Sequence, residues 1–170
     1  RGLGDVYKRQ IENLSQKENE WVEKYYEENI LPLIAPTTLD PAHPFPFIQN
    51  QGKGLFIEMS YGKNKEINSV ILLPKNLNRF TRLPGEEHKY IFLEDLITRF
   101  IDKIYPNHKL KNFGMFRVLR DSEIEIDDEA DDLIDEFEAA LKARRRGDVV
   151  SLEISSNLSK NTQKLLQREL

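Results

Sequence analysis

A stretch rich in proline decides how this chain is arranged: Thr38-Leu39-Asp40-Pro41-Ala42-His43-Pro44-Phe45-Pro46-Phe47. Each proline fixes its own φ at about −65° and has no N–H to donate, so neither a helix nor a central strand can run through the stretch. We therefore predict a rigid, extended connector. Because Phe45 and Phe47 alternate with Pro46, we expect both rings to lie on one side and to anchor the connector on a core.

The overall composition is that of a water-soluble domain. The chain has 170 residues, which is enough for one ordinary domain with a small extension. It has no apolar run long enough for a transmembrane helix and no cysteine, so disulfides, thiolate metal sites and cysteine nucleophiles are excluded. We expect a cytoplasmic location, with peripheral attachment to a membrane left open. The formal net charge of −4 argues against nucleic-acid binding and means that a polyanion would need a local basic patch.

Residues 11–29 are predicted to form a helix that precedes the connector. Ser15 can cap it, and Glu18 three residues later completes a capping box. One face of this helix is aromatic and typical of a core: Trp21, Val22, Tyr25 and Tyr26. We expect this face to have little to pack against within the chain. Residues 1–10 lack an apolar period, and we interpret them as a non-native leader.

The chain beyond the connector alternates strands and helices. Residues 54–61 and 66–74 are apolar and are separated by a polar turn, which predicts an antiparallel hairpin. A strand at 90–93 is expected to run into a helix that ends at Tyr105-Pro106-Asn107. The buried stripe of this helix has the spacing of an α-helix: Leu93, Leu96, Ile97, Phe100, Ile101 and Ile104.

Residues 113–121 are predicted to form a further strand, with Arg117 and Arg120 on opposite faces. We expect one of these arginines to pair with a neighbouring carboxylate and the other to lie in solvent. A last strand at 148–154 should place Val150, Leu152 and Ile154 on one side, and a helix should begin near Asn157.

The acidic run 122–132 resembles a calcium loop only poorly, because Ile126 stands where such a loop needs glycine. We interpret it as the start of a helix over 127–146 that ends in Arg144, Arg145 and Arg146, with Gly147 at its C′ position. The three arginines are then either the basic end of a helix or a functional basic patch. Gly52-Lys53-Gly54 lacks the spacing of a phosphate loop and precedes a strand, so we do not assign it that role.

Together these elements predict an α+β fold. We expect one mixed, mostly antiparallel sheet from about Gly54 to Ile154, with covering helices at 93–105 and 127–146 and with the N-terminal helix before it.

Stretches in four places, in this order, resemble the head (middle) domain of bacterial polyphosphate kinase. One is the connector, and others are an Arg-Phe after a proline, an apolar helix closed by Tyr-Pro, and a Phe-Arg-Val-x-Arg-Asp strand. The resemblance implies that 11–29 end a helical N-terminal domain and that 30–170 are a head domain truncated at its C-terminus. The motif residues with a structural role in this comparison are Asp40, Pro41, His43, Pro44, Phe45, Pro46, Arg79, Phe80, Phe116, Arg117, Arg120 and Asp121.

The family transfers the γ-phosphate of ATP, with Mg²⁺, through a phosphohistidine to the end of polyphosphate, and it forms dimers or higher homo-oligomers. The resemblance implies that the catalytic histidine and the phosphate-binding arginines lie downstream of the head. None of His43, His88 and His108 occupies the family's catalytic motif, so we assign no catalytic, cofactor or metal residue here. We expect this piece to be inactive alone and to bind neither ATP nor Mg²⁺. The alternative is a stand-alone α+β interaction module without kinase activity.

Overall fold

The computed structural model describes residues 7–8, 14–40, 45–62, 65–85, 89–121 and 147–170. These form two sheets, one of five strands in the order β2-β4-β3-β7-β8 and one of three strands in the order β1-β6-β5. The strands are β1 (Tyr7–Lys8), β2 (Pro36–Leu39), β3 (Lys53–Tyr61), β4 (Lys65–Leu72), β5 (Phe80–Arg82), β6 (Lys89–Phe92), β7 (His108–Arg120) and β8 (Val149–Ile154). The helices are α1 (Gln16–Tyr25), α2 (Leu93–Arg99), α3 (Ile101–Ile104) and α5 (Lys160–Glu169).

All strand pairs in the five-stranded sheet are antiparallel. The predicted hairpin is confirmed, since β3 and β4 pair with Leu55 opposite Ile71. β7 pairs with the other edge of β3, and β8 pairs with β7. β3 has buried residues on both faces, which explains its almost continuous run of apolar residues. The α+β prediction is confirmed, but the strands divide into two sheets rather than one, and the described parallel pairing is between β1 and β6.

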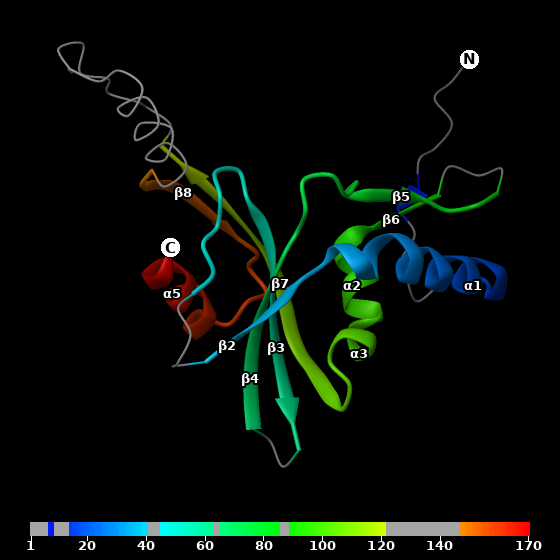
Figure 1. Cartoon of the computed structure of the whole chain (residues 1–170), viewed down its shortest axis with the longest axis horizontal. Coiled ribbons are helices and arrows are strands. Elements are labelled where there is room, and N and C mark those ends of the chain that lie inside the picture. Colours follow the sequence, from blue (N-terminus) through cyan, green and yellow to red (C-terminus); the bar gives the residue numbers. More distant parts are fainter. Residues whose placement is uncertain (1–6, 9–13, 41–44, 63–64, 86–88, 122–146) are drawn as a thin grey trace, which may run out of the picture.

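Each face of the five-stranded sheet is covered by a separate hydrophobic core. On one side, α1 and α2 pack over β3 and β4, and Leu96 and Ile97 of α2 are fully buried. On the other side, α5 and the end of the connector cover Phe56, Phe116 and Val118. Figure 1 shows this arrangement, with α5 on one side of the sheet and α1, α2 and α3 on the other. The sheet is thus the central layer of a three-layer structure.

α1 is part of the same core as the sheet. Its capping box forms as predicted, because the Ser15 hydroxyl accepts from the Glu18 N–H and the Glu18 carboxylate accepts from the Ser15 N–H. Val22 and Tyr26 are fully buried, and the Tyr26 ring lies 4.8 Å from that of Phe100, centroid to centroid. The expectation that this face has little to pack against is therefore wrong, since the first core cluster includes residues of α1, β3 and α2. The helical path continues through a π-helical turn (Tyr26–Ile30) and a 3₁₀ turn (Leu31–Leu33).

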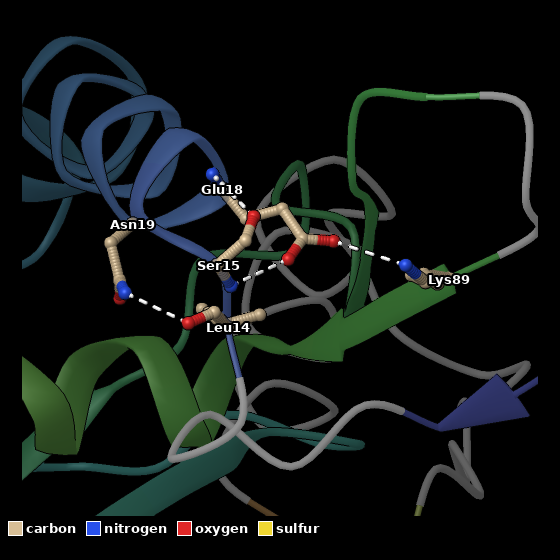
Figure 2. A network of polar contacts seen from close by, with 5 residues as sticks. All are labelled: Leu14, Ser15, Glu18, Asn19 and Lys89. Carbon is tan, nitrogen blue, oxygen red and sulfur yellow. Dashed lines mark hydrogen bonds and ion pairs between the residues drawn. The ribbon is translucent and has the colours of Figure 1, made fainter.

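Polar contacts also hold α1 against the elements that follow the hairpin. We call these contacts the α1 clamp: Glu18 with Lys89 at 3.4 Å, Glu23 and Glu27 with Lys103 at 2.6 and 2.5 Å, and Asn19 with Arg99 at 2.8 Å. Figure 2 shows the Ser15, Glu18 and Lys89 part of the clamp together with the Asn19 side chain, which donates to the Leu14 carbonyl. The hydrogen bonds from Ser15, helped by Lys89, lower the pKa of Glu18. The carboxylates of Glu23 and Glu27 raise the pKa of Lys103.

The connector is anchored differently from the prediction. Phe45 is half-buried against the second core, but Phe47 is 49% exposed and Ile48 is the fully buried residue. Phe47 is held by Arg120, whose guanidinium lies 4.7 Å from the ring centroid. The expectation that both phenylalanines enter a core is therefore wrong for Phe47, which makes a cation–π contact instead.

A bulge changes the face assignment in β8. The register between β7 and β8 shifts between Leu119 and Arg120, so that Arg120 pairs with Val149. Val150 is 65% exposed, whereas Val149, Leu152 and Ile154 pack against the second core. The predicted grouping of Val150 with Leu152 and Ile154 is wrong because the extra residue of a bulge reverses the alternation of side chains.

Gly147 is required by a close approach of two backbones. A Cβ at this position would lie 2.1 Å from the Asp121 carbonyl oxygen, and the Asp121 N–H donates to the Asp148 carbonyl at 2.8 Å. The two chain segments that flank 122–146 therefore meet here. The predicted helix over 127–146, and with it the C′ role of Gly147, lies outside the described residues.

Candidate functional site

A hollow lies where β3 begins, bordered by the link after β4 and by β7 and β8. It consists of two adjoining cavities of about 220 and 240 Å³, which share Lys53, Arg79, Met115 and Arg117. We call it the basic trough. Its lining carries the cations Lys53, Lys75, Arg79 and Arg117. The first cavity is completed by Gln51 and by apolar residues that we call the floor, Leu73, Pro74, Leu77, Leu93 and Met115, and the second by Phe116, Glu153, Ile154 and Ser155.

The sheet register places three charged residues side by side across the trough. Lys53 of β3 is directly opposite Arg117 of β7, and Arg117 is directly opposite Glu153 of β8. Directly paired residues share a face of the sheet, with Cβ atoms about 5 Å apart, and like charges in such a pair repel. The row thus contains a repelling Lys53–Arg117 pair that Glu153 neutralises only in part.

The Arg117 guanidinium keeps most of its hydrogen-bonding capacity free. Its ion pair with Glu153 is long, at 3.5 Å between Nη1 and Oε1, and both side chains are substantially exposed. Its Nε–H is buried and has no hydrogen-bond partner among the described residues. A guanidinium carries five N–H donors, so Arg117 can still donate to a further acceptor.

Arg79 lines both cavities and is held in place by Glu94 and Phe92. Its guanidinium donates to the Glu94 carboxylate at 2.9 Å and lies over the Phe92 ring at 5.5 Å from the centroid. The Arg79 carbonyl accepts from the Leu93 N–H at 2.9 Å, which fixes the link to the start of α2. The other Glu94 oxygen, Oε2, is buried and has no partner among the described residues. Phe80 packs its ring on Phe92, with 4.8 Å between the centroids.

Lys53 and Lys75 are both exposed, and no described carboxylate forms an ion pair with either of them. Lys53 is fixed at its backbone, because its carbonyl accepts from the Leu73 N–H at 2.9 Å. Lys75 lies in the turn from Pro74 to Leu77. At the far end, the Ser155 hydroxyl accepts from the Met115 N–H at 2.9 Å and so ties the end of β8 to β7.

Three of the motif residues predicted from the sequence line this trough: Arg79, Phe116 and Arg117. Arg79 and Arg117 come from separate motifs, and the structure brings them to one cavity. Phe116 is fully buried, and its ring fills the space above Gly54, where a Cβ would lie 2.3 Å from it. Phe116 therefore supports the strand pair that carries Lys53 and Arg117.

Arg120 lies on the opposite face and has a structural task. Its Nε donates to the Ile48 carbonyl at 2.8 Å, its Nη1 donates to the Gly147 carbonyl at 2.9 Å, and its N–H donates to Asn50 Oδ1 at 2.9 Å. The prediction that one arginine pairs with a carboxylate is confirmed by Arg117 and Glu153. The prediction that the other lies in solvent is wrong, because Arg120 binds backbone carbonyls of the connector and of the segment before β8.

The remaining motif residues do not join the trough. Asp40 and Asp121 are exposed, and Phe45 and Pro46 are half-buried on the connector. Pro41, His43 and Pro44 lie outside the described residues, as do His88 and the predicted basic patch of Arg144, Arg145 and Arg146. The structural roles assigned to these residues by resemblance stay predictions.

His108 is the one histidine within the described part of the chain. Its Nδ1 lies 2.9 Å from the Pro106 carbonyl, and its ring lies between Tyr61 and Tyr105 at centroid distances of 4.9 and 5.7 Å. It is separated from Arg117 by nine residues of β7, or about 30 Å of extended strand. Within the described ranges, no three His, Asp or Glu side chains gather as a metal centre, and no helix is long and apolar enough to cross a membrane.

Sequence reasoning missed Lys53 and Lys75. The rejection of a phosphate loop at Gly52-Lys53-Gly54 holds, since Lys53 opens a strand and no helix follows it. No spacing in the sequence pairs Lys53 with Arg117, because that pair depends on the register between two strands that are far apart along the chain. Lys75 is exposed and follows Pro74, and no sequence pattern marks it as a site residue.

The chain matches known proteins along almost its whole length. A family model described as the polyphosphate kinase middle domain matches residues 17–170. The chain belongs to the polyphosphate kinase family. It is 46% identical over 150 residues to a polyphosphate kinase of Erythrobacter litoralis, with 88% of this chain and 21% of that protein covered. It is 30% identical over 169 residues to a polyphosphate kinase of Mycobacterium ulcerans, with 93% of this chain and 23% of that protein covered.

The fold agrees with this family assignment. A crystal structure of polyphosphate kinase from Porphyromonas gingivalis matches with a TM-score of 0.74 at 18% identity, covering 96% of this chain and 23% of that one. The resemblance identified from the motifs is therefore confirmed. The chain spans between a fifth and a quarter of the length of these relatives.

Proposed function

We propose that this chain is the middle-domain part of an enzyme that transfers the γ-phosphate of ATP through a phosphohistidine to the end of inorganic polyphosphate. The observation that supports the proposal best is the family match over residues 17–170, together with relatives that bear the name polyphosphate kinase. Because the chain covers only about a fifth of the Erythrobacter relative, the activity is proposed for the whole protein.

Within that enzyme, we assign this piece a structural role rather than a chemical one. The sheet has a hydrophobic core on each face and can serve as a framework that fixes how the flanking domains sit. His108 contacts tyrosine rings and a backbone carbonyl, which gives no reason to assign it as the phosphate acceptor. We propose that the catalytic histidine is encoded outside this piece.

ATP and Mg²⁺ are proposed for the whole enzyme. The described residues do not fit either group, because they hold no cluster of three carboxylate or histidine ligands and Lys53 opens a strand rather than a phosphate loop. We therefore derive no step through ATP or Mg²⁺ at this domain. The proposal further includes a homo-oligomeric enzyme with polyphosphate as substrate, without nucleic-acid binding, in the cytoplasm or peripherally on its membrane.

The test uses the complete reading frame that contains this chain. The purified product, given ATP and Mg²⁺, should form acid-insoluble polyphosphate and should carry an acid-labile, base-stable phosphate from γ-labelled ATP. The 170-residue chain alone, and its His108→Ala variant, should incorporate no label. A complete product that neither forms polyphosphate nor becomes labelled would overturn the enzyme proposal and favour a stand-alone interaction module. Label on the 170-residue chain would overturn its structural role.

A further inference from the structure

We propose that the basic trough is a binding site for the linear phosphate chain of polyphosphate, with Lys53, Lys75, Arg79 and Arg117 as its contacts. The inference rests on the proposed function, which makes polyphosphate the substrate of the whole enzyme. It assigns part of the binding of that substrate to the middle domain, at residues that carry no catalytic role.

The first argument is the unbalanced charge of the trough. Lys53 and Arg117 face each other across two paired strands, an arrangement that repulsion disfavours and that a bound anion relieves. All four cations line the cavity of about 220 Å³, and no carboxylate is among its lining residues. Glu153 lines only the second cavity and reaches Arg117 at 3.5 Å, the outer limit of a hydrogen bond.

The second argument is the free hydrogen-bonding capacity of the same groups. Lys53 and Lys75 are exposed and form no ion pair with a described residue, so each ammonium has donors available. Arg117 keeps unused N–H groups, and Arg79 is already oriented by Glu94 and Phe92. Held guanidinium groups and mobile ammonium groups together are well suited to the oxygens of successive phosphates.

The third argument is the shape of the trough. It runs from the link after β4 across β3 and β7 to the end of β8. Three strand spacings measure about 14 Å, which takes a run of several phosphates rather than a single ion.

A nucleotide fits this lining less well. Recognition of a base needs an aromatic ring for stacking or a set of polar groups at the base edges. Among the described residues of the lining, the only aromatic ring is that of Phe116, which is 1% exposed and packs over Gly54. The lining therefore offers cations along its length but no platform for a base.

The test compares two pairs of lysine substitutions that remove the same charge. The double variant Lys53→Gln/Lys75→Gln alters the trough. The matched control, Lys109→Gln/Lys164→Gln, alters two lysines that are equally exposed and lie outside the trough lining. Calorimetric titration of the 170-residue chain with long-chain polyphosphate, at several salt concentrations, measures the affinity. Circular dichroism checks that each variant is folded.

We expect the trough variant to bind long-chain polyphosphate about tenfold more weakly, with the slope of log K against log salt reduced by about 1.5, and the control to change less than about twofold. Equal weakening of binding in both variants would mean that only general electrostatic attraction was lost, and it would overturn the proposal. A wild-type chain that does not bind polyphosphate would also overturn it. Titration with ATP and with poly-glutamate identifies the ligand class. Either one binding as tightly as polyphosphate, with the same loss in the trough variant, would also overturn it.

Substitutions in the complete reading frame provide a second measurement. The trough pair should shorten the polyphosphate product more than the control pair does, because a growing chain with fewer contacts dissociates earlier. Products of equal length would contradict the proposal. If the complete protein makes polyphosphate but the two variants behave alike, the trough proposal fails and the proposed function stands. If the chain binds polyphosphate at the trough but the complete protein makes none, the proposed function fails.

Discussion

The α1 clamp and the basic trough both use lysine and arginine side chains, but they use them in opposite ways. In the clamp, each cation meets an oxygen on α1 or on the π-helical turn after it: Lys89 meets Glu18, Lys103 meets Glu23 and Glu27, and Arg99 meets Asn19. In the trough, Lys53 and Lys75 meet no carboxylate of the described residues, and Lys53 faces another cation. The cations of the clamp are thus all paired, whereas the two lysines that we assign to a ligand form no ion pair with a described residue.

We expect the largest loss of stability from a substitution in the hydrophobic core that α1 shares with the sheet. Ile30 is 1% exposed within the core that α1 shares with the sheet, so Ile30→Ala should lower the free energy of unfolding by about 2–5 kcal/mol. The matched change in the trough floor, Leu77→Ala, removes a half-buried side chain and should cost less than about 1.5 kcal/mol. Urea denaturation measures both changes. Equal losses would mean that the trough floor is as much a part of the core as α1.

The second prediction compares the loss of stability on replacing each of the two arginines of β7. Arg120→Ala removes two hydrogen bonds to backbone carbonyls and the contact with Phe47, and it should cost about 2–4 kcal/mol. Arg117→Ala removes one long ion pair and one repulsion, so we expect a change within about 0.5 kcal/mol. Chemical denaturation of both variants provides the comparison. A loss at Arg117 as large as that at Arg120 would show that the trough arginine also holds the fold.

A smaller effect should appear as a pH dependence of the clamp. The folded-state pKa of Glu18 is lowered below its ordinary value of 4.5, so its contribution is fully present above that value and is lost as the pH falls through the lowered pKa. Glu18→Gln should lower the free energy of unfolding by about 0.5–1 kcal/mol near pH 7, and this difference from wild type should shrink as the pH falls below 4.5.

Urea denaturation over that range measures the Glu18 effect. Glu20→Gln, an exposed change on the same helix, serves as the control and should retain the pH dependence of the wild type. A difference between wild type and Glu18→Gln that stays constant with pH would contradict the lowered pKa.

Much of the local structure could be predicted from the sequence. The capping box at Ser15 and the apolar stripe from Leu93 are patterns that act over a few residues. The first gives the predicted start of α1, and the second gives helical structure that is divided at Phe100 into α2 and α3. The motif residues Arg79 and Arg117 also indicated the family before the fold was known. These signals depend on neighbours in sequence, which is why they could be found there.

The candidate site could not be predicted in the same way, because it depends on the register in which strands pair. The register of β3 and β7 places Lys53 beside Arg117, and a bulge in β8 turns Val150 outward. The contacts of Arg120 could not be predicted, because its partners are the backbone carbonyls of Ile48 and Gly147, which leave no pattern in the sequence. Pairing across a sheet and binding to backbone are both set by the tertiary fold, so the residues alone do not indicate them.

The most direct test of the unpaired charge is thermal unfolding of wild type and Lys53→Gln, each with and without long-chain polyphosphate. Without polyphosphate, the variant should melt about 1–3 °C higher, because it removes a repulsion of about 0.2–1 kcal/mol. With polyphosphate, the melting temperature of the wild type should rise more than that of the variant, since the stabilisation by a bound ligand grows with the logarithm of its affinity. A variant that melts lower without polyphosphate, and gains as much as wild type with it, would contradict the account.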